Sequence, residues 1–314
     1  MTVPPRSSPA TALSLREIIR LAGEQLRKSN ALIWLAAVGI IAGLVCLAVD
    51  AWRGGVPIGA EGDLSKPASF NIAIGIYLLT LAMLFPSSGL TPRGARRWIG
   101  WTIALFSYAI VLETVQTFRG LDPRFSRVGS PVDNILGGVF GLNAIGFIVL
   151  FVVLARGFFR HRPDLRAPVV LAIRYGCIST MAAFGAGVWM SAIQGRHTGA
   201  AGNVLPLHAL GFHGLQAIPV IALLLVWSGA EDGTAQRWVH GAGLAWLAVC
   251  AAVFYQTFIG RSVFERSPAV IVSAFLMMVW AAIAAFAFWQ WLRLPATPRG
   301  SPDISRTPTV NTRA

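Results

Sequence analysis

The sequence has 314 residues, of which 55% are hydrophobic and only 12% are charged, and its mean hydropathy is +0.64. Soluble domains carry about 25% charged residues, so this composition excludes a soluble enzyme, a disulfide-rich secreted domain and a disordered chain. The formal net charge is +13, but the basic residues are scattered through short loops and tails, which argues against a nucleic-acid partner. The composition predicts an all-α, polytopic integral membrane protein.

Polar segments lie at both ends of the chain. Residues 1–12 are rich in Pro and Ser and are predicted to be disordered. In residues 13–29, apolar and basic positions follow a helical spacing, and Ser14 and Glu17 have the spacing of a capping box. This segment is predicted to form an amphipathic helix on the membrane surface. Residues 294–314 are again polar and are predicted to form a disordered tail.

Between these segments, residues 30–293 contain eight apolar stretches and predict a single transmembrane bundle of about eight helices. Each stretch is near the ~20 residues that cross ~30 Å of hydrocarbon. No internal repeat is evident on inspection, which leaves the inverted-repeat architecture of many transporters without support. The predicted spans are 31–49, 67–85, 98–118, 132–154, 169–193, 205–227, 239–259 and 270–292.

The distribution of basic residues between the loops predicts the orientation. Eighteen of the 26 Lys and Arg residues fall on the side of the two termini, and eight fall on the other side. Loops rich in Lys and Arg stay in the cytoplasm. Both termini are therefore predicted to be cytoplasmic, in a multi-pass protein of the inner (plasma) membrane.

Polar residues within the predicted spans gather toward the extracytoplasmic side. Ionisable groups at membrane depth normally face a bundle interior or a water-filled cavity, so this gathering predicts one polar cavity open to that side. Alternatively, the long cationic side chains extend to the headgroups, and Asp133 only caps a helix. The residues are Lys66, Asn71, Glu113, Gln116, Arg119, Asp133, Asn134, His208, His213, Gln216, Gln256 and Arg261.

The span 205–227 is the most informative segment. At ~100° per residue, His208, His213 and Gln216 fall on one broad helix face, and Pro219 frees a backbone carbonyl below them. The two histidines are five residues apart, which is a poor spacing for chelating one metal. A metal or haem bound there needs partners on other helices, of which Glu113 and Asp133 are the nearest candidates. A hydrogen-bonded structural pair of His213 and Gln216 is the alternative.

Several short motifs resemble an uncharacterised family of bacterial multi-pass membrane proteins over residues 66–265. The most specific is H-x-x-G-[LF]-H-x-x-Q-x-x-P at His208–Pro219, and it is accompanied by K-P-x-x-F at 66–70, Q-x-x-R-G at 116–120 and P-x-D at 131–133. The resemblance implies the importance of these positions but no particular reaction. One departure concerns residues 123–126, where Pro-Arg-Phe-Ser replaces the S-H-F-N of the family. The missing His weakens the hypothesis that this loop supplies a metal ligand.

The hypothesis favoured by the sequence is a membrane-embedded enzyme that acts on a lipophilic or periplasmic small molecule. Glu113 and His213 would perform acid–base catalysis, because burial and mutual interaction bring a carboxylate and an imidazole toward neutral pKa values. The residues predicted to bind the substrate are Gln116, Arg119, Asp133, His208, Gln216, Gln256 and Arg261.

Three alternatives stay open. A transporter or permease would use the same cavity, a haem- or metal-binding redox protein would use His208 and His213 as ligands, and a sensor or assembly factor would have no catalysis. The sequence contains no G-x-S-x-G or Walker motif. Membrane lipids are the expected partners; the cofactor and the oligomeric state are not specified by these patterns.

Overall fold

The computed structural model describes residues 15–27, 29–160 and 165–293. The predicted disordered termini and Ser14 of the predicted capping box lie outside the described residues. The described part is almost entirely helical, which confirms the all-α fold class. The elements are α1 (Leu15–Arg27), α2 (Asn30–Trp52), α3 (Ser65–Leu84), η1 (Phe85–Ser87), α4 (Pro92–Phe118), α5 (Pro131–Ala155), η2 (Arg156–Phe159), α6 (Ala167–Ala192), β1 (His197–Thr198), β2 (Gly202–Asn203), α7 (Leu205–Trp227), α8 (Asp232–Phe258) and α9 (Pro268–Leu292).

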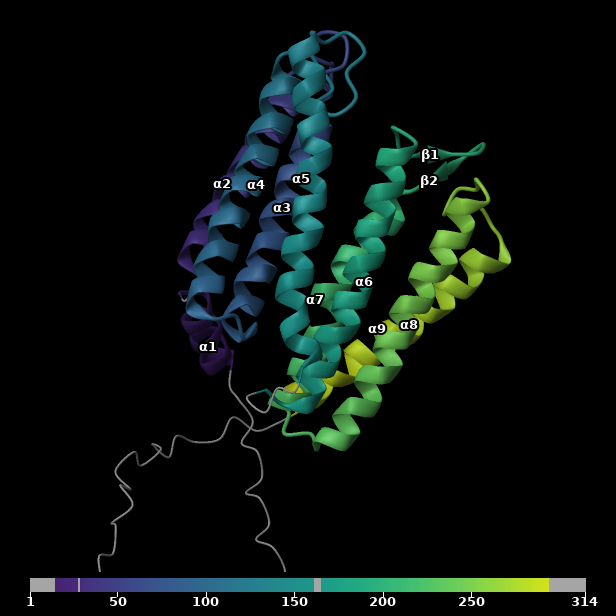
Figure 1. The fold of residues 1–314 in the computed structure, drawn as a ribbon. Coiled ribbons are helices and arrows are strands. Elements are labelled where there is room, and N and C mark those ends of the chain that lie inside the picture. Colours follow the sequence, from purple (N-terminus) through teal and green to yellow (C-terminus); the bar gives the residue numbers. More distant parts are fainter. Residues whose placement is uncertain (1–14, 28, 161–164, 294–314) are drawn as a thin grey trace, which may run out of the picture.

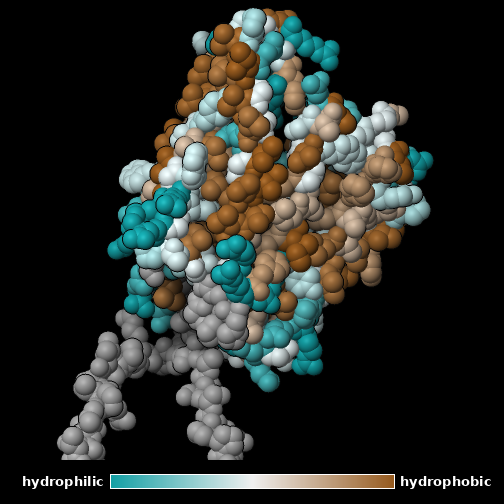
Figure 2. Space-filling view, viewed as in Figure 1, coloured by the Kyte–Doolittle hydropathy of each residue, from teal (hydrophilic) through white to brown (hydrophobic). Residues whose placement is uncertain are grey.

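Eight of the described helices, α2 to α9, are long and apolar enough to cross a membrane. They match the eight predicted spans, and α7 continues as one helix through Pro219. Large apolar side chains remain exposed along them, including Trp34 (74%), Leu142 (68%) and Ile271 (67%). Figure 2 shows hydrophobic residues over much of the helical surface, with hydrophilic residues mainly toward the ends. This surface is suited to lipid rather than water, so the protein is a multi-pass membrane protein.

Three membrane helices begin in the same way, with a hydroxyl side chain at the N-cap followed by Pro. Thr91 caps α4, Ser130 caps α5 and Ser267 caps α9, and each accepts a hydrogen bond from a backbone amide of the first turn. Such a side chain satisfies an amide that the helix leaves unpaired, while Pro at the first position lacks that amide. These local signals fix where the helices begin at each membrane surface.

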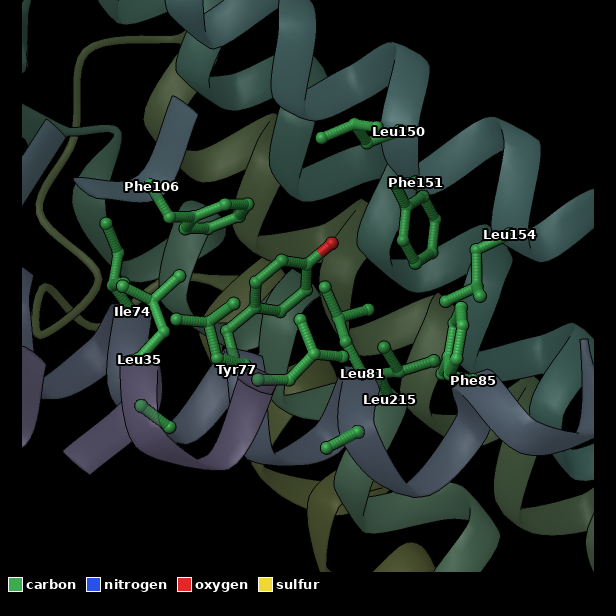
Figure 3. Packing of buried hydrophobic residues seen from close by; sticks show 14 of the residues in the cluster. Leu35, Ile74, Tyr77, Leu81, Phe85, Phe106, Leu150, Phe151, Leu154 and Leu215 are labelled. Atoms are coloured by element: carbon green, nitrogen blue, oxygen red, sulfur yellow. The ribbon is translucent and has the colours of Figure 1, made fainter. Parts of the chain in front are cut away.

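The helices form two groups of four, α2–α5 and α6–α9 (Figure 1). Aromatic side chains pack where the groups meet. The ring of Tyr77 on α3 lies 5.2 Å from that of Phe212 on α7, and Phe184 on α6 lies 5.1 Å from Phe212 and 5.6 Å from Phe151 on α5. Figure 3 shows Tyr77 and Phe151 among the buried leucines of this core. The two groups therefore share one hydrophobic core.

These two groups are copies of one four-helix unit, which corrects the expectation that the chain has no internal repeat. Helix α2 packs on α3 and α4, as α6 packs on α7 and α8, and α4 packs on α5 as α8 packs on α9. Helices α4 and α8 both begin and end at an offset of 140 residues. Since four membrane helices separate the starts of the two copies, both copies run in the same direction, and the repeat is parallel rather than inverted.

The repeat extends to the backbone of the loops at the upper end of the bundle in Figure 1 (residues 53–64, 119–130, 193–204 and 259–267). Gly59 and Gly120 have φ angles of +58° and +79°, and a Cβ atom at Gly59 would lie 3.1 Å from the Cα of Gly120. The amide of Glu61 donates to the carbonyl of Gly120 at 3.0 Å. Only glycine combines such φ angles with such close contact. The second copy repeats the arrangement with Gly199, Gly260 and Ala201.

Candidate functional site

Glu113 lies near the upper end of α4 and has no exposed surface. Its Oε1 atom accepts a 2.7 Å hydrogen bond from the guanidinium of Arg124, which belongs to the loop 119–130. Its Oε2 atom has no hydrogen-bond partner among the described residues, and neither has Nε of Arg124. Buried polar atoms are normally paired. This ion pair therefore retains one acceptor and one donor that a small polar molecule can satisfy.

The loop 119–130 reaches Glu113 because it packs tightly against α5. A Cβ atom at Gly137 would lie 2.9 Å from the carbonyl oxygen of Arg124, so only glycine leaves room for this backbone. The guanidinium of Arg124 lies over the rings of Phe70 and Phe140, at 5.7 and 5.8 Å from their centroids. The faces of the rings favour the cation. Gly137 thus allows the loop 119–130 to pack closely against α5.

A second ion pair lies beside the first. The carboxylate of Asp133 accepts hydrogen bonds from Gln116 Nε2 at 2.9 Å and from Arg119 at 2.5 Å. Asp133 also closes a capping box with Ser130 at the start of α5, so it is both a capping residue and the partner of a cation. Half of the side-chain surface of Arg119 is exposed. Arg119 is therefore the member of this group that is accessible from outside the bundle.

Two further carboxylates organise the loop. Asp122 forms an ion pair with Lys66 at 3.2 Å and accepts the amides of Arg124 and Phe125. Burial acts to raise the pKa of Asp122, but these amides and Lys66 outweigh it and the pKa lies below its usual value. For Glu61, too, burial acts to raise the pKa, and hydrogen bonds from the Ser126 side chain and from loop amides lower it overall. Both carboxylates are therefore held in the charged form.

The residues predicted on α7 occupy different surroundings. Nδ1 of His208 lies 2.8 Å from the carbonyl oxygen of Ala183 on α6, and its ring packs edge-on against Phe212. His213 is exposed and lines a groove of about 250 Å³ with Gln216 and Trp280. The hydrogen bonds described for these histidines do not connect them with Glu113. The proton exchange between Glu113 and His213 stays a prediction.

Gln216 links the two copies of the repeat. Its side-chain amide is hydrogen-bonded to the hydroxyl of Thr80 on α3 at 2.9 Å. With the amide turned so that its oxygen accepts from Thr80, its nitrogen also donates to the carbonyl oxygen of His213 at 3.2 Å, so Gln216 is bonded within its own helix, as predicted, and across to the first copy. Polar side chains commonly hold membrane helices together in this way. The bond indicates a structural contribution for Gln216.

Gln256 and Arg261 belong to the upper end of the second copy. Gln256 is buried, donates to the carbonyl of Ser262 at 3.0 Å and accepts from the hydroxyl of Ser267 at 2.8 Å. Arg261 forms an ion pair with Glu265 at 3.1 Å, and both side chains are about half exposed. Gln256 thus ties the end of α8 to the N-cap of α9, just as Gln116 ties α4 to the start of α5.

The predicted site residues therefore fall into three groups. Their separation follows from the duplication, since each copy builds its own loop cluster at the upper end. The described residues contain no group of three His, Cys, Asp or Glu side chains placed to hold a metal ion. The groups are the charged cluster of Lys66, Glu113, Gln116, Arg119 and Asp133; the α7 residues His208, His213 and Gln216; and the second-copy residues Gln256 and Arg261.

Sequence reasoning did not identify Arg124, Asp122 or Glu61 as site residues. All three are charged residues in loops, where solvated side chains are the rule, and the sequence marks Arg124 only as part of a departure from the S-H-F-N pattern. A carboxylate buried in a membrane helix signals that a cation lies nearby, but this signal does not single out Arg124 and does not point to the carboxylates Asp122 and Glu61. Comparisons with protein-family models, curated proteins and solved structures find no match for this chain.

Proposed function

We propose that the protein is a membrane-embedded enzyme in which Glu113 accepts and returns a proton during a reaction of a lipophilic or periplasmic molecule. The observation that supports this proposal is the buried Glu113 carboxylate, in which Oε1 is fixed by Arg124 and Oε2 has no hydrogen-bond partner in the described part of the chain. A general base needs a fixed position and a free lone pair. The proposal places the site at the extracytoplasmic face of the plasma membrane, as the loop charges predict.

In this proposal the neighbouring residues bind the polar part of the substrate. Arg119 is half exposed and shares the carboxylate of Asp133, so it can turn toward an anionic group such as a phosphate. The apolar tail of an amphipathic substrate would remain in the bilayer beside α5, whose surface is lined by exposed apolar residues such as Val139 and Leu142. His213 is a second candidate for acid–base catalysis. We also propose that the protein belongs to the bacterial family that its motifs resemble.

The test is complementation of a deletion strain, with lipid and metabolite profiles as the readout. Glu113→Gln keeps the size of the side chain and removes the proton acceptor, so it should leave the profile of the deletion unchanged. Glu265→Gln is the matched control, because Glu265 is an exposed carboxylate of the second copy, and it should restore the wild-type profile. Full restoration by a Glu113→Gln protein of normal abundance would sink the proposal. His213→Ala, measured in parallel, tests the second candidate.

One observation favours a transporter as the second candidate. Parallel repeats are a common architecture of transporters, in which the two copies move relative to each other around a central site. Here the copies meet at Tyr77 and Phe212, and the Tyr77 hydroxyl has no hydrogen-bond partner among the described residues. Flux of a candidate substrate into proteoliposomes would decide: flux lost in Glu113→Gln favours transport, whereas chemical conversion without flux favours the enzyme.

A further inference from the structure

The carboxylate of Glu61 binds the loop 119–130 at three points. Its Oε2 atom accepts the hydroxyl of Ser126 at 2.5 Å and the amide of Asp122 at 3.0 Å, and its Oε1 atom accepts the amide of Arg127 at 2.8 Å. These partners lie on both sides of Arg124 in the sequence. A carboxylate that accepts several amide and hydroxyl donors is a strong local anchor. Glu61 therefore fixes the segment that carries Arg124.

Fixing this segment determines where the Arg124 guanidinium lies. The backbone of Arg124 is held from one side by Gly137 of α5 and from the other by the carboxylate of Asp122. Its guanidinium lies over two aromatic rings and reaches Glu113. A shift of this loop would withdraw the cation from a carboxylate that has no exposed surface. Leaving such a charge unpaired is strongly unfavourable.

The second copy shows that the fold does not require this carboxylate. Ala201 occupies the position of Glu61, and its amide donates to Gly260 at 2.9 Å, as that of Glu61 donates to Gly120. The second copy also has Val253 at the position of Glu113, and its loop after the helix, 259–267, is three residues shorter than 119–130. The copy without a buried carboxylate thus also lacks the anchor. The anchor and the charged site occur together.

We propose that Glu61 is a positioning residue, which holds the segment 122–127 so that Arg124 pairs with Glu113. This inference rests on the proposed function of Glu113. Glu61 does not touch Glu113 and acts through the loop. The consequence is that the buried carboxylate and the anchor that positions its partner both belong to the first copy of the repeat.

The test compares Glu61→Ala, Glu61→Gln and the control Glu265→Ala in the full-length protein. Glu61→Ala introduces the residue found in the second copy, so the protein should fold, with an unchanged circular dichroism spectrum. Amide hydrogen exchange in residues 122–127 should rise on the order of ten-fold, while exchange in the loop 259–267 should stay the same. Glu61→Gln keeps one acceptor oxygen and should show an intermediate exchange rate. Glu265→Ala should leave exchange in residues 122–127 unchanged.

Complementation separates this inference from the proposed function. If Glu61→Ala loosens the loop and lowers complementation, with Glu61→Gln restoring part of both, the positioning role is supported. If Glu113→Gln fails to complement while Glu61→Ala exchanges and complements like the wild type, the positioning role is wrong and the function of Glu113 stands. If Glu113→Gln complements fully, the proposed function is wrong, whatever the loop does.

Discussion

Arg124, in the loop after α4, donates a 2.7 Å hydrogen bond to Glu113, a carboxylate with no exposed surface near the membrane boundary. The partner of a residue inside a membrane helix thus comes from outside the helix. Buried ion pairs contribute little net stability compared with well-packed apolar residues, whereas removing one partner is costly. The second copy of the repeat has an apolar residue, Val253, at the position of Glu113. The pair in the first copy therefore calls for a functional explanation.

The pairing of Asp133 predicts its contribution to stability. Asp133→Asn removes the charge that Arg119 and Gln116 share and weakens the capping box at the start of α5. We expect the free energy of unfolding to fall by about 1–3 kcal/mol, measured by thermal denaturation in detergent. The exposed neighbour Asn134 is the control, and Asn134→Ala should differ little from the wild type. Equal stability of both variants would contradict the ion-pair account.

The duplication predicts that two glycines far apart in the sequence respond alike to substitution. Gly120 and Gly260 have φ angles of +79° and +73° and lie against Gly59 and Gly199. Alanine at either position should destabilise the protein by about 1–3 kcal/mol, because the left-handed backbone and the close contact both disfavour a Cβ atom.

Gly138 in α5 is the control for these substitutions, because a Cβ atom there would meet nothing within 4 Å. Gly138→Ala should be neutral or stabilising by up to about 1 kcal/mol. Thermal denaturation in detergent measures all three variants. A neutral Gly260→Ala beside a destabilising Gly120→Ala would show that the loop contact is not equivalent in the two copies.

The loop carboxylates predict how stability depends on pH. The pKa values of Glu61 and Asp122 are lowered in the folded protein, so both groups stabilise it fully above their unfolded pKa values of about 4. This stabilisation is lost as the pH falls through the lower, folded pKa values. The melting temperature of the wild type should therefore drop below about pH 4, and Glu61→Gln should reduce the drop. Parallel curves for the two proteins would rule out a contribution of Glu61.

The surroundings of the histidines predict the optical spectrum. The contact of His208 Nδ1 with the carbonyl of Ala183 leaves Nε2 as the only ring nitrogen that could ligate a metal, and the described residues offer no group of three metal-binding side chains to complete a site. We expect the purified protein, oxidised or reduced with dithionite, to show no Soret band and to contain no stoichiometric metal by elemental analysis. A Soret band or one bound metal per chain would contradict this expectation and support the redox hypothesis for His208 and His213.

Hydropathy predicted the eight membrane helices because lipid imposes the same demand along every span. The grouping of Gln116, Arg119 and Asp133 was also predictable, since a helix end and the next helix start meet at the same membrane surface. The contact of Arg124 with Glu113 was not predictable, because it depends on the close approach of the loop to Gly137. No local pattern encodes that approach.

The repeat was missed for a different reason. Residues on the apolar helix faces exchange freely among Leu, Ile, Val, Phe and Ala without changing the fold. Identity survives mainly where the backbone demands it, as in Gly-Ala-x-Gly at 59–62 and 199–202, and in Gln-Thr-Phe-x-Gly at 116–120 and 256–260. These short segments are inconspicuous until the glycines are seen to touch each other.

The central claim is that the Glu113–Arg124 pair serves function and not folding. The double variant Glu113→Val, Arg124→Leu tests it most directly, because it replaces both charges with apolar residues and introduces at position 113 the residue found at 253. We predict a melting temperature equal to or above that of the wild type, together with no restoration of the lipid and metabolite profile of a deletion strain. Full restoration of that profile by the apolar variant would contradict the account, since the pair would then be structural.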